Sequence, residues 1–83
     1  MSAYDYVLRA SAARVVLGSS KRLRREILSE LERLAREPFS KPDLEETGPS
    51  GRTYAIRVRE RIILTYWVDH AAKEVCVIRV EIC

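Results

Sequence analysis

Arginines in the C-terminal half of the chain are the residues best suited to bind negatively charged groups. Arg57, Arg59 and Arg61 lie within one stretch of alternating residues, and Arg79 lies in a later one. A guanidinium group binds phosphate or carboxylate in a bidentate way, so this spacing predicts a basic rim for RNA phosphates or for the acids of a protein partner. The alternative is a charged strand edge that prevents aggregation.

The other reactive side chains indicate neither a metal site nor a catalytic group. His70 is the only histidine, and no serine, cysteine or second histidine lies near it in the sequence. Cys76 and Cys83 do not have the spacing of a metal-binding or redox pair, and we expect no disulfide. We therefore expect no metal and no cofactor.

A second basic cluster spans residues 21–25, at the start of a predicted helix. Cations are unfavourable in the first turn of a helix, because the helix dipole places partial positive charge there. Docking onto nucleic acid or an acidic partner would explain the cluster. Pairing of Arg22 with Glu26, four residues on, is the alternative that we favour.

Length and composition indicate a single folded domain over residues 1–83. The chain has 83 residues, 47% hydrophobic and 33% charged, with a formal net charge of +3. No apolar run approaches the roughly 20 residues that span a bilayer, and the N-terminus lacks the apolar stretch of a signal peptide. We expect a cytoplasmic protein that does not bind membranes.

The N-terminal half predicts one strand followed by two helices. Alternation over residues 4–8 indicates a strand, and Ser11 is suited to cap a short helix that ends at Leu17. Apolar residues recur at helical spacing from a Ser20 cap to a stop at Pro38. The two helices would form a hairpin.

The C-terminal half predicts three strands, at residues 53–58, 62–68 and 75–82, after a loop rich in Pro and Gly. The expected fold class is α+β, with the two-helix hairpin packed on one face of a four-stranded, mainly antiparallel sheet in the order β-α-α-β-β-β.

The length of the turn after Val58 decides which side chains face the helices, because a shift of one residue sends every side chain to the opposite face. A two-residue turn would set Arg57 opposite Leu64, among aliphatic residues. We favour a turn of three residues, 59–61, which sets Val58 opposite Ile62, because burying an unpaired arginine costs several kcal/mol.

This register predicts an outward sheet face that is unusually apolar. It would bury Tyr54 and Tyr66 in the core and place Arg57 outside with Trp67, a large amphipathic ring of the kind that anchors interfaces or stacks on a base. Unbroken alternation in the last strand would put Cys76, Ile78, Val80 and Ile82 under the helices. The outward face would then carry Ile63, Trp67, Val75 and Val77, edged by Arg57 and Arg79.

These residues resemble a known family. The segments "YVLRASAARVV…SKRLRREILSELERLAREPF" and "GRTYAIRVRERIILTYWVDHAAKEVCVIRV" are similar to the RelE/ParE superfamily, the toxins of type II toxin-antitoxin systems. The resemblance runs from Tyr6 to about Val80. It rests on the element order, the helix end "LERLAREP", the loop closing in Gly-Arg-x-Tyr, and "RVR…IILTYWVD…VIRV".

The resemblance implies a compact basic toxin that a cognate antitoxin wraps and neutralises. RelE-like members enter the ribosomal A site and cut mRNA, whereas ParE-like members inhibit DNA gyrase. The RelE-like cleavage needs no metal: the ribose 2′-hydroxyl attacks the adjacent phosphate, and Lys and Arg stabilise the developing charge. A C-terminal Tyr or His-type group assists proton transfer.

Most RelE catalytic positions are not matched in this sequence. Of two lysines on the second strand, one position matches Ala55 and the other Arg57. The third-strand arginine falls on Ile63, and the arginine after the last strand falls near Cys83. The aromatic acid-base residue falls beyond the end of the chain.

The resemblance therefore implies a type II toxin with a cognate antitoxin, and three alternatives stay open for its action. They are a divergent ribosome-dependent mRNA endoribonuclease, a noncatalytic toxin that acts on gyrase or another target, and a degenerate member that only binds a partner. The catalytic candidates are Arg57 and Arg79. The candidates for RNA or partner binding are Arg59, Arg61, Ile63, Trp67 and Val77.

Overall fold

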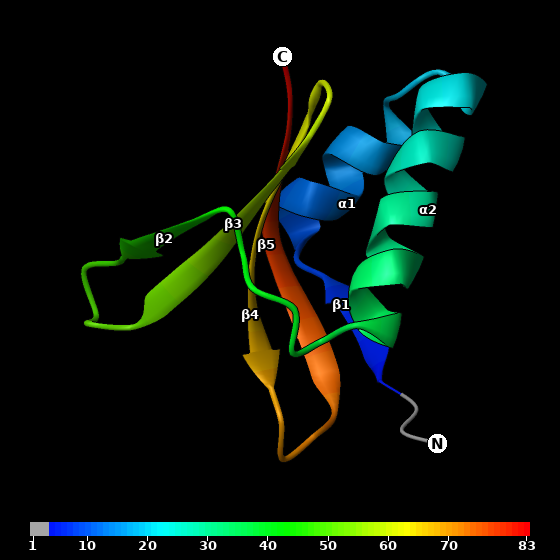
Figure 1. Cartoon of the computed structure of the whole chain (residues 1–83). Coiled ribbons are helices and arrows are strands. Elements are labelled where there is room, and N and C mark those ends of the chain that lie inside the picture. Colours follow the sequence, from blue (N-terminus) through cyan, green and yellow to red (C-terminus); the bar gives the residue numbers. More distant parts are fainter. Residues whose placement is uncertain (1–3) are drawn as a thin grey trace.

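Two helices cover one face of a five-stranded sheet in the computed structural model, which describes residues 4–83 (Figure 1). The β2–β3 hairpin forms one edge of the sheet, and its tip projects away from the helices. The elements are β1 (Asp5–Leu8), α1 (Ala10–Leu17), α2 (Lys21–Arg36), β2 (Leu44–Thr47), β3 (Thr53–Arg59), β4 (Ile62–Asp69) and β5 (Glu74–Ile82).

The α+β class is confirmed, but the expected number of strands is wrong. The sheet has five strands in the order β1-β5-β4-β3-β2, with β1 parallel to β5 and the other pairs antiparallel. The additional strand is β2, which pairs with β3 within the predicted loop. Its four residues are all exposed, so it lacks the apolar alternation by which a half-buried strand is identified from sequence.

The helix termini agree with the prediction for α2 and differ for α1. Ser20 caps α2, and its Oγ accepts a hydrogen bond from the Leu23 N–H at 3.2 Å. Ser11 is not a cap, because α1 begins at Ala10 and Arg9 occupies the cap position. The Ser11 hydroxyl instead donates to the Ile78 carbonyl at 3.0 Å. Arg24 donates to three carbonyls at the end of α1, which explains one cation of the 21–25 cluster.

The core lies between the helix hairpin and strands β4 and β5. Burial of apolar surface of this kind contributes about 25 cal/mol per Å². Its buried residues are Ala12 and Val16 of α1, Ile27, Leu31 and Leu34 of α2, Ile62, Leu64 and Tyr66 of β4, and Val75, Val77 and Val80 of β5.

The β3–β4 turn has two residues, so the predicted three-residue turn is wrong. Arg59 pairs with Ile62 and Arg57 pairs with Leu64, which places both arginines on the helix side of the sheet. Glu60 has a φ of 52°. A positive φ at only the first central residue is typical of a type II′ turn, where glycine is the usual residue. The sequence offers Glu-Arg instead and so gives no signal for this turn.

A β-bulge in β5 explains the second error. Tyr66 pairs with Val77 and Thr65 pairs with Arg79, so Ile78 has no partner on β4. The extra residue changes the phase of the strand. Val75 and Val77 therefore point into the core rather than outward, while Cys76 and Ile78 are only half-buried. Val80 lies in the core as predicted.

The predicted orientation of β4 is correct despite the wrong turn. Ile62, Leu64 and Tyr66 are buried under the helices, and Trp67 lies on the opposite face. Tyr54, on β3, follows the observed register and is half-buried rather than part of the core.

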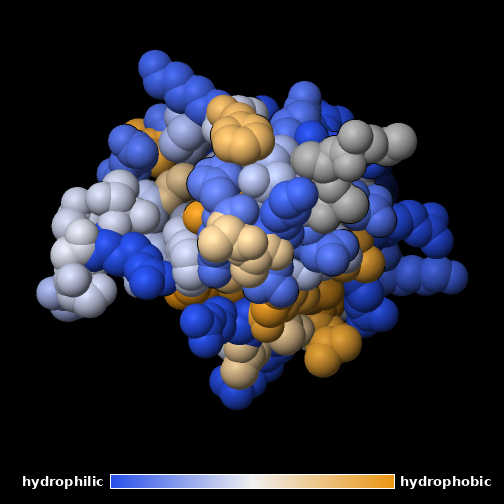
Figure 2. All heavy atoms as spheres, turned by 90° about the horizontal axis from the view of Figure 1, so that it is seen from below, coloured by the Kyte–Doolittle hydropathy of each residue, from blue (hydrophilic) through white to orange (hydrophobic). Residues whose placement is uncertain are grey.

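The surface is mixed in character. The view from below shows hydrophobic atoms in separate patches between hydrophilic ones (Figure 2). Among residues 4–83, no helix is both long enough and apolar enough to cross a membrane.

Candidate functional site

Arg57 is a buried residue rather than part of an exposed rim. It is 7% exposed, and its Nη2 donates to Ser40 Oγ at 2.6 Å and to the Lys41 carbonyl at 3.4 Å. Its Nε is buried and has no hydrogen-bond partner among the described residues. The guanidinium therefore holds the loop after α2 against β3 and is not presented to a ligand.

Arg79, the other catalytic candidate, lies on the opposite side of the sheet. Its partner Thr65 pairs in turn with Ile56, whereas Arg57 pairs with Leu64 on the helix side. The Arg79 guanidinium lies 3.3 Å from Glu81 and 3.9 Å from Glu46. Because a sheet separates Arg57 from Arg79, the two cannot stabilise charge on the same phosphate.

The sheet face turned away from the helices, here called the outer face, carries two of the five predicted binding residues. Ile63 is half-buried there between Val58 and Glu81, and Trp67 pairs with Cys76. Val77 does not belong to this face, since it is 0% exposed in the core.

Trp67 is held by Arg52, a residue that was not among the predicted binding residues. The Arg52 guanidinium carbon lies 4.0 Å from the centroid of the indole. A cation over the face of tryptophan is attracted to the ring by about 0.5–1 kcal/mol at an exposed site. The pair presents an apolar ring and a positive charge together on the outer face.

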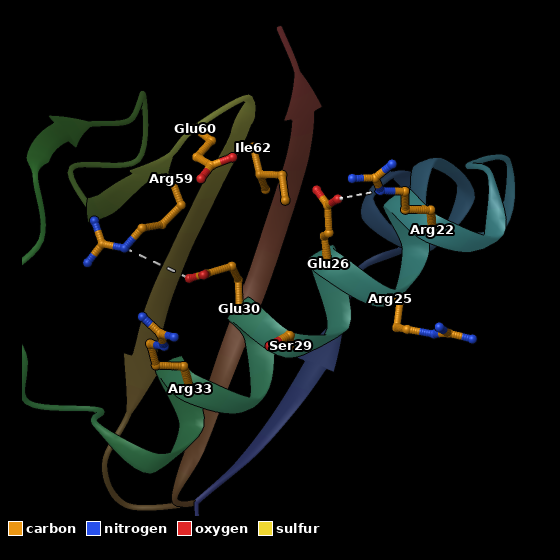
Figure 3. A pocket seen from close by; sticks show the side chains of 9 residues that line it. All are labelled: Arg22, Arg25, Glu26, Ser29, Glu30, Arg33, Arg59, Glu60 and Ile62. Carbon is orange, nitrogen blue, oxygen red and sulfur yellow. Dashed lines mark ion pairs between the residues drawn. The ribbon is translucent and has the colours of Figure 1, made fainter.

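A cleft on the helix side gathers Arg59 and residues of α2 (Figure 3). It has a volume of about 650 Å³. The cleft lies between α2 and the β3–β4 hairpin, and its lining residues are Arg22, Arg25, Glu26, Ser29, Glu30, Arg33, Arg59, Glu60 and Ile62.

Ion pairs connect the hairpin arginines to α2. Arg59 Nε lies 3.9 Å from Glu30 Oε2, and Arg61 Nη2 lies 3.8 Å from Glu26 Oε2. The predicted pairing of Arg22 with Glu26 is confirmed, at 3.6 Å. The two pairs of Glu26 are exposed, and exposed pairs contribute about 0–1 kcal/mol each, so they orient Arg22 and Arg61 more than they stabilise the fold.

Glu30 and Arg33 are charged cleft residues that were not identified from the sequence. Arg33 lies on the same helix face as Arg22, Arg25 and Ser29, at intervals of three and four residues, which is a signal available in the sequence. The wrong hairpin register concealed it, because that register placed Arg59 in the turn rather than on the strand opposite α2.

His70 and Cys76 are the remaining candidate reactive groups with a defined environment. Phe39 stacks on His70 with ring centroids 4.7 Å apart, and the Tyr4 hydroxyl lies 2.9 Å from His70 Nδ1. Burial raises the pKa of the Cys76 thiol, and the carboxylates of Glu74 and Asp69 raise it further. Across residues 4–83, no three His, Cys, Asp or Glu side chains lie close enough to hold a metal ion.

Solved structures share this fold over nearly the whole chain. A chain of the Mycobacterium tuberculosis toxin-antitoxin complex RelBE2 is 24% identical with a TM-score of 0.76, covering 99% of this chain and 100% of that one. The isolated Escherichia coli RelE toxin is 17% identical with a TM-score of 0.73, covering 98% of this chain and 85% of that one. The Pyrococcus horikoshii RelE–RelB complex has a chain that is 13% identical with a TM-score of 0.74, covering 98% and 96%.

No protein-family model matches the sequence, and no curated protein matches it. The structural likeness establishes that this chain has the fold found in these RelE structures.

Proposed function

We propose that this protein is the toxin of a type II toxin-antitoxin pair, acting in the cytoplasm and neutralised by a cognate antitoxin that binds its outer face. The observation that carries the proposal is the fold, which matches the isolated RelE toxin and chains of RelE complexes across at least 98% of the sequence.

The composition of the outer face supports a protein partner. Trp67 with its stacked Arg52 lies beside half-buried aliphatic residues, and Arg79 supplies a further cation. Aromatic residues and arginine are enriched at the centres of protein interfaces, where a few buried anchors carry most of the binding energy. Trp67 would be such an anchor for the antitoxin, with Ile63 farther along β4 on the same face.

The geometry favours a toxin that acts by binding its target over one that cleaves RNA. Cleavage requires several cations directed at one phosphate, but Arg57 is buried on one side of the sheet and Arg79 lies on the other. Ala55 and Ile63 occupy two further positions where the resemblance implies cations. The resemblance implies two targets. Action on mRNA at the ribosome would require cleavage chemistry, whereas action on DNA gyrase would require only binding.

Incubation with ribosomes programmed with mRNA tests this choice. We expect the mRNA to stay intact at the protein concentration that is reached in cells whose growth this protein inhibits. Cleavage that disappears in the Arg79→Ala variant would contradict a binding-only mechanism and would make Arg79 catalytic.

The antitoxin contact is tested by affinity for the product of the reading frame adjacent to this gene. We expect Trp67→Ala to weaken binding roughly 30-fold, as truncation of an aromatic anchor commonly costs about 2 kcal/mol. Phe39→Ala is the matched control, because Phe39 is 76% exposed but lies away from the outer face, stacked on His70. Equal affinities of the Trp67→Ala and Phe39→Ala variants for this product would show that the antitoxin does not bind the outer face through Trp67.

A further inference from the structure

Three aromatic rings from distant parts of the sequence form a cluster at one end of the molecule. Phe39 lies in the loop after α2, His70 in the β4–β5 turn and Tyr4 directly before β1. These segments lie at the end opposite the link between α1 and α2 (Figure 1). Phe39 stacks on His70 with an interplanar angle of 10°, and Tyr4 meets Phe39 edge-on with ring centroids 6.0 Å apart. The function proposed above does not use this cluster.

The loop that carries the phenyl ring is fixed on both sides of it. The buried guanidinium of Arg57 donates to Ser40 Oγ and to the Lys41 carbonyl, directly after the ring in the sequence. Pro38 and Pro42 flank the same stretch, and each fixes its own φ. The ring is therefore held in place before any partner arrives, which lowers the entropy cost of binding it.

This fixed ring faces solvent. Phe39 is 76% exposed, so most of its surface adds nothing to the core. Single exposed apolar residues are common on protein surfaces, but here three rings are in contact and a buried arginine holds the loop. Rigid, exposed aromatic side chains are typical anchors of protein interfaces, because they bury a large area and lose few rotamers.

The charge around the cluster indicates the kind of partner. A surface that binds nucleic acid needs an excess of cations to neutralise phosphates, whereas the centre of a protein interface is aromatic and poor in net charge. Within three residues of the rings the sequence has three acidic and three basic side chains, Asp5, Glu37 and Asp69 against Arg36, Lys41 and Lys73. This balance fits a protein surface with an apolar pocket.

We infer that the Phe39–His70–Tyr4 cluster is the surface by which this protein binds the cellular protein that it inhibits, and that Phe39 inserts into an apolar pocket of that target. The inference rests on the proposed function, because it names a surface through which the toxin acts. It separates inhibition from neutralisation, since Trp67 on the outer face serves the antitoxin and Phe39 serves the target.

Growth inhibition by Phe39→Ala tests the inference, with Leu17→Ala as the matched control. Leu17 is similarly exposed, at 73%, but it ends α1 at the opposite end of the molecule. We expect Phe39→Ala to need roughly tenfold more protein per cell than wild type to halve the growth rate, and Leu17→Ala to stay within about twofold. Phe39→Tyr keeps the ring and should inhibit like wild type. Equal thermal midpoints of the variants would show that all are folded.

The outcomes separate this inference from the proposed function. Inhibition by Phe39→Ala at the wild-type protein level would overturn the cluster as the target surface and leave the toxin assignment intact. Equal loss of inhibition in Phe39→Ala and Leu17→Ala would also overturn it, whereas absence of inhibition by wild type would overturn both proposals. Wild-type binding to single-stranded oligouridylate that is lost in Phe39→Ala would assign the cluster to nucleic acid and overturn the inference.

Discussion

The Arg57 guanidinium joins the loop after α2 to the central part of the sheet. It donates to Ser40 Oγ and the Lys41 carbonyl, so the charge is buried with hydrogen bonds rather than alone. Burial of an arginine is strongly unfavourable only when its donors lack acceptors. In this protein the loop supplies acceptors for Nη2, whereas Nε has none among the described residues, and Arg57 acts as a structural residue.

Arg57→Ala should therefore lower the free energy of unfolding by about 2 kcal/mol, because it leaves the loop acceptors unpaired and removes buried side-chain volume. Urea denaturation followed by Trp67 fluorescence measures this. Arg61→Ala is the control, since Arg61 is about half exposed and only weakly paired with Glu26, and it should change stability by less than about 0.5 kcal/mol. Equal stability of the two variants would mean that Arg57 does not support the loop.

At the scale of elements, the β3–β4 hairpin and the bulge in β5 determine which face each side chain occupies. The sequence predicts the helices, three of the four strands after α2 and the orientation of β4, because these follow hydrophobic periodicity. It does not predict the two-residue turn at Glu60, which has no glycine or asparagine, or the bulge at Ile78, which breaks an alternation that looks regular. The wrong turn placed Arg57 on the outer face in the prediction, and the missed bulge placed Val75 and Val77 there. All three lie on the helix side of the sheet.

Glu60→Gly should raise the free energy of unfolding by about 0.5–1 kcal/mol, because glycine adopts a positive φ without the strain of a side chain. Thermal or urea unfolding measures the change. Arg61→Gly should have the opposite effect, since Arg61 does not have a positive φ and loses its ion pair with Glu26. A loss of stability in Glu60→Gly would contradict the assigned turn.

The whole molecule combines the fold of RelE structures with an outer face that carries Trp67 and a charged cleft on the helix side of the sheet. The sequence predicts this fold through its element order and local patterns, and it predicts Trp67 and Ile63 on the outer face correctly. It does not place Arg33 and Arg59 in a common cleft, because that contact joins residues far apart in the sequence and depends on the hairpin register.

Growth of cells that express this chain alone is the direct test of whether the protein is a toxin. We expect induction to stop growth, and co-expression of the product of the adjacent reading frame to restore it at an unchanged level of the chain. Unimpeded growth with abundant folded protein and no antitoxin present would contradict the assignment as a toxin.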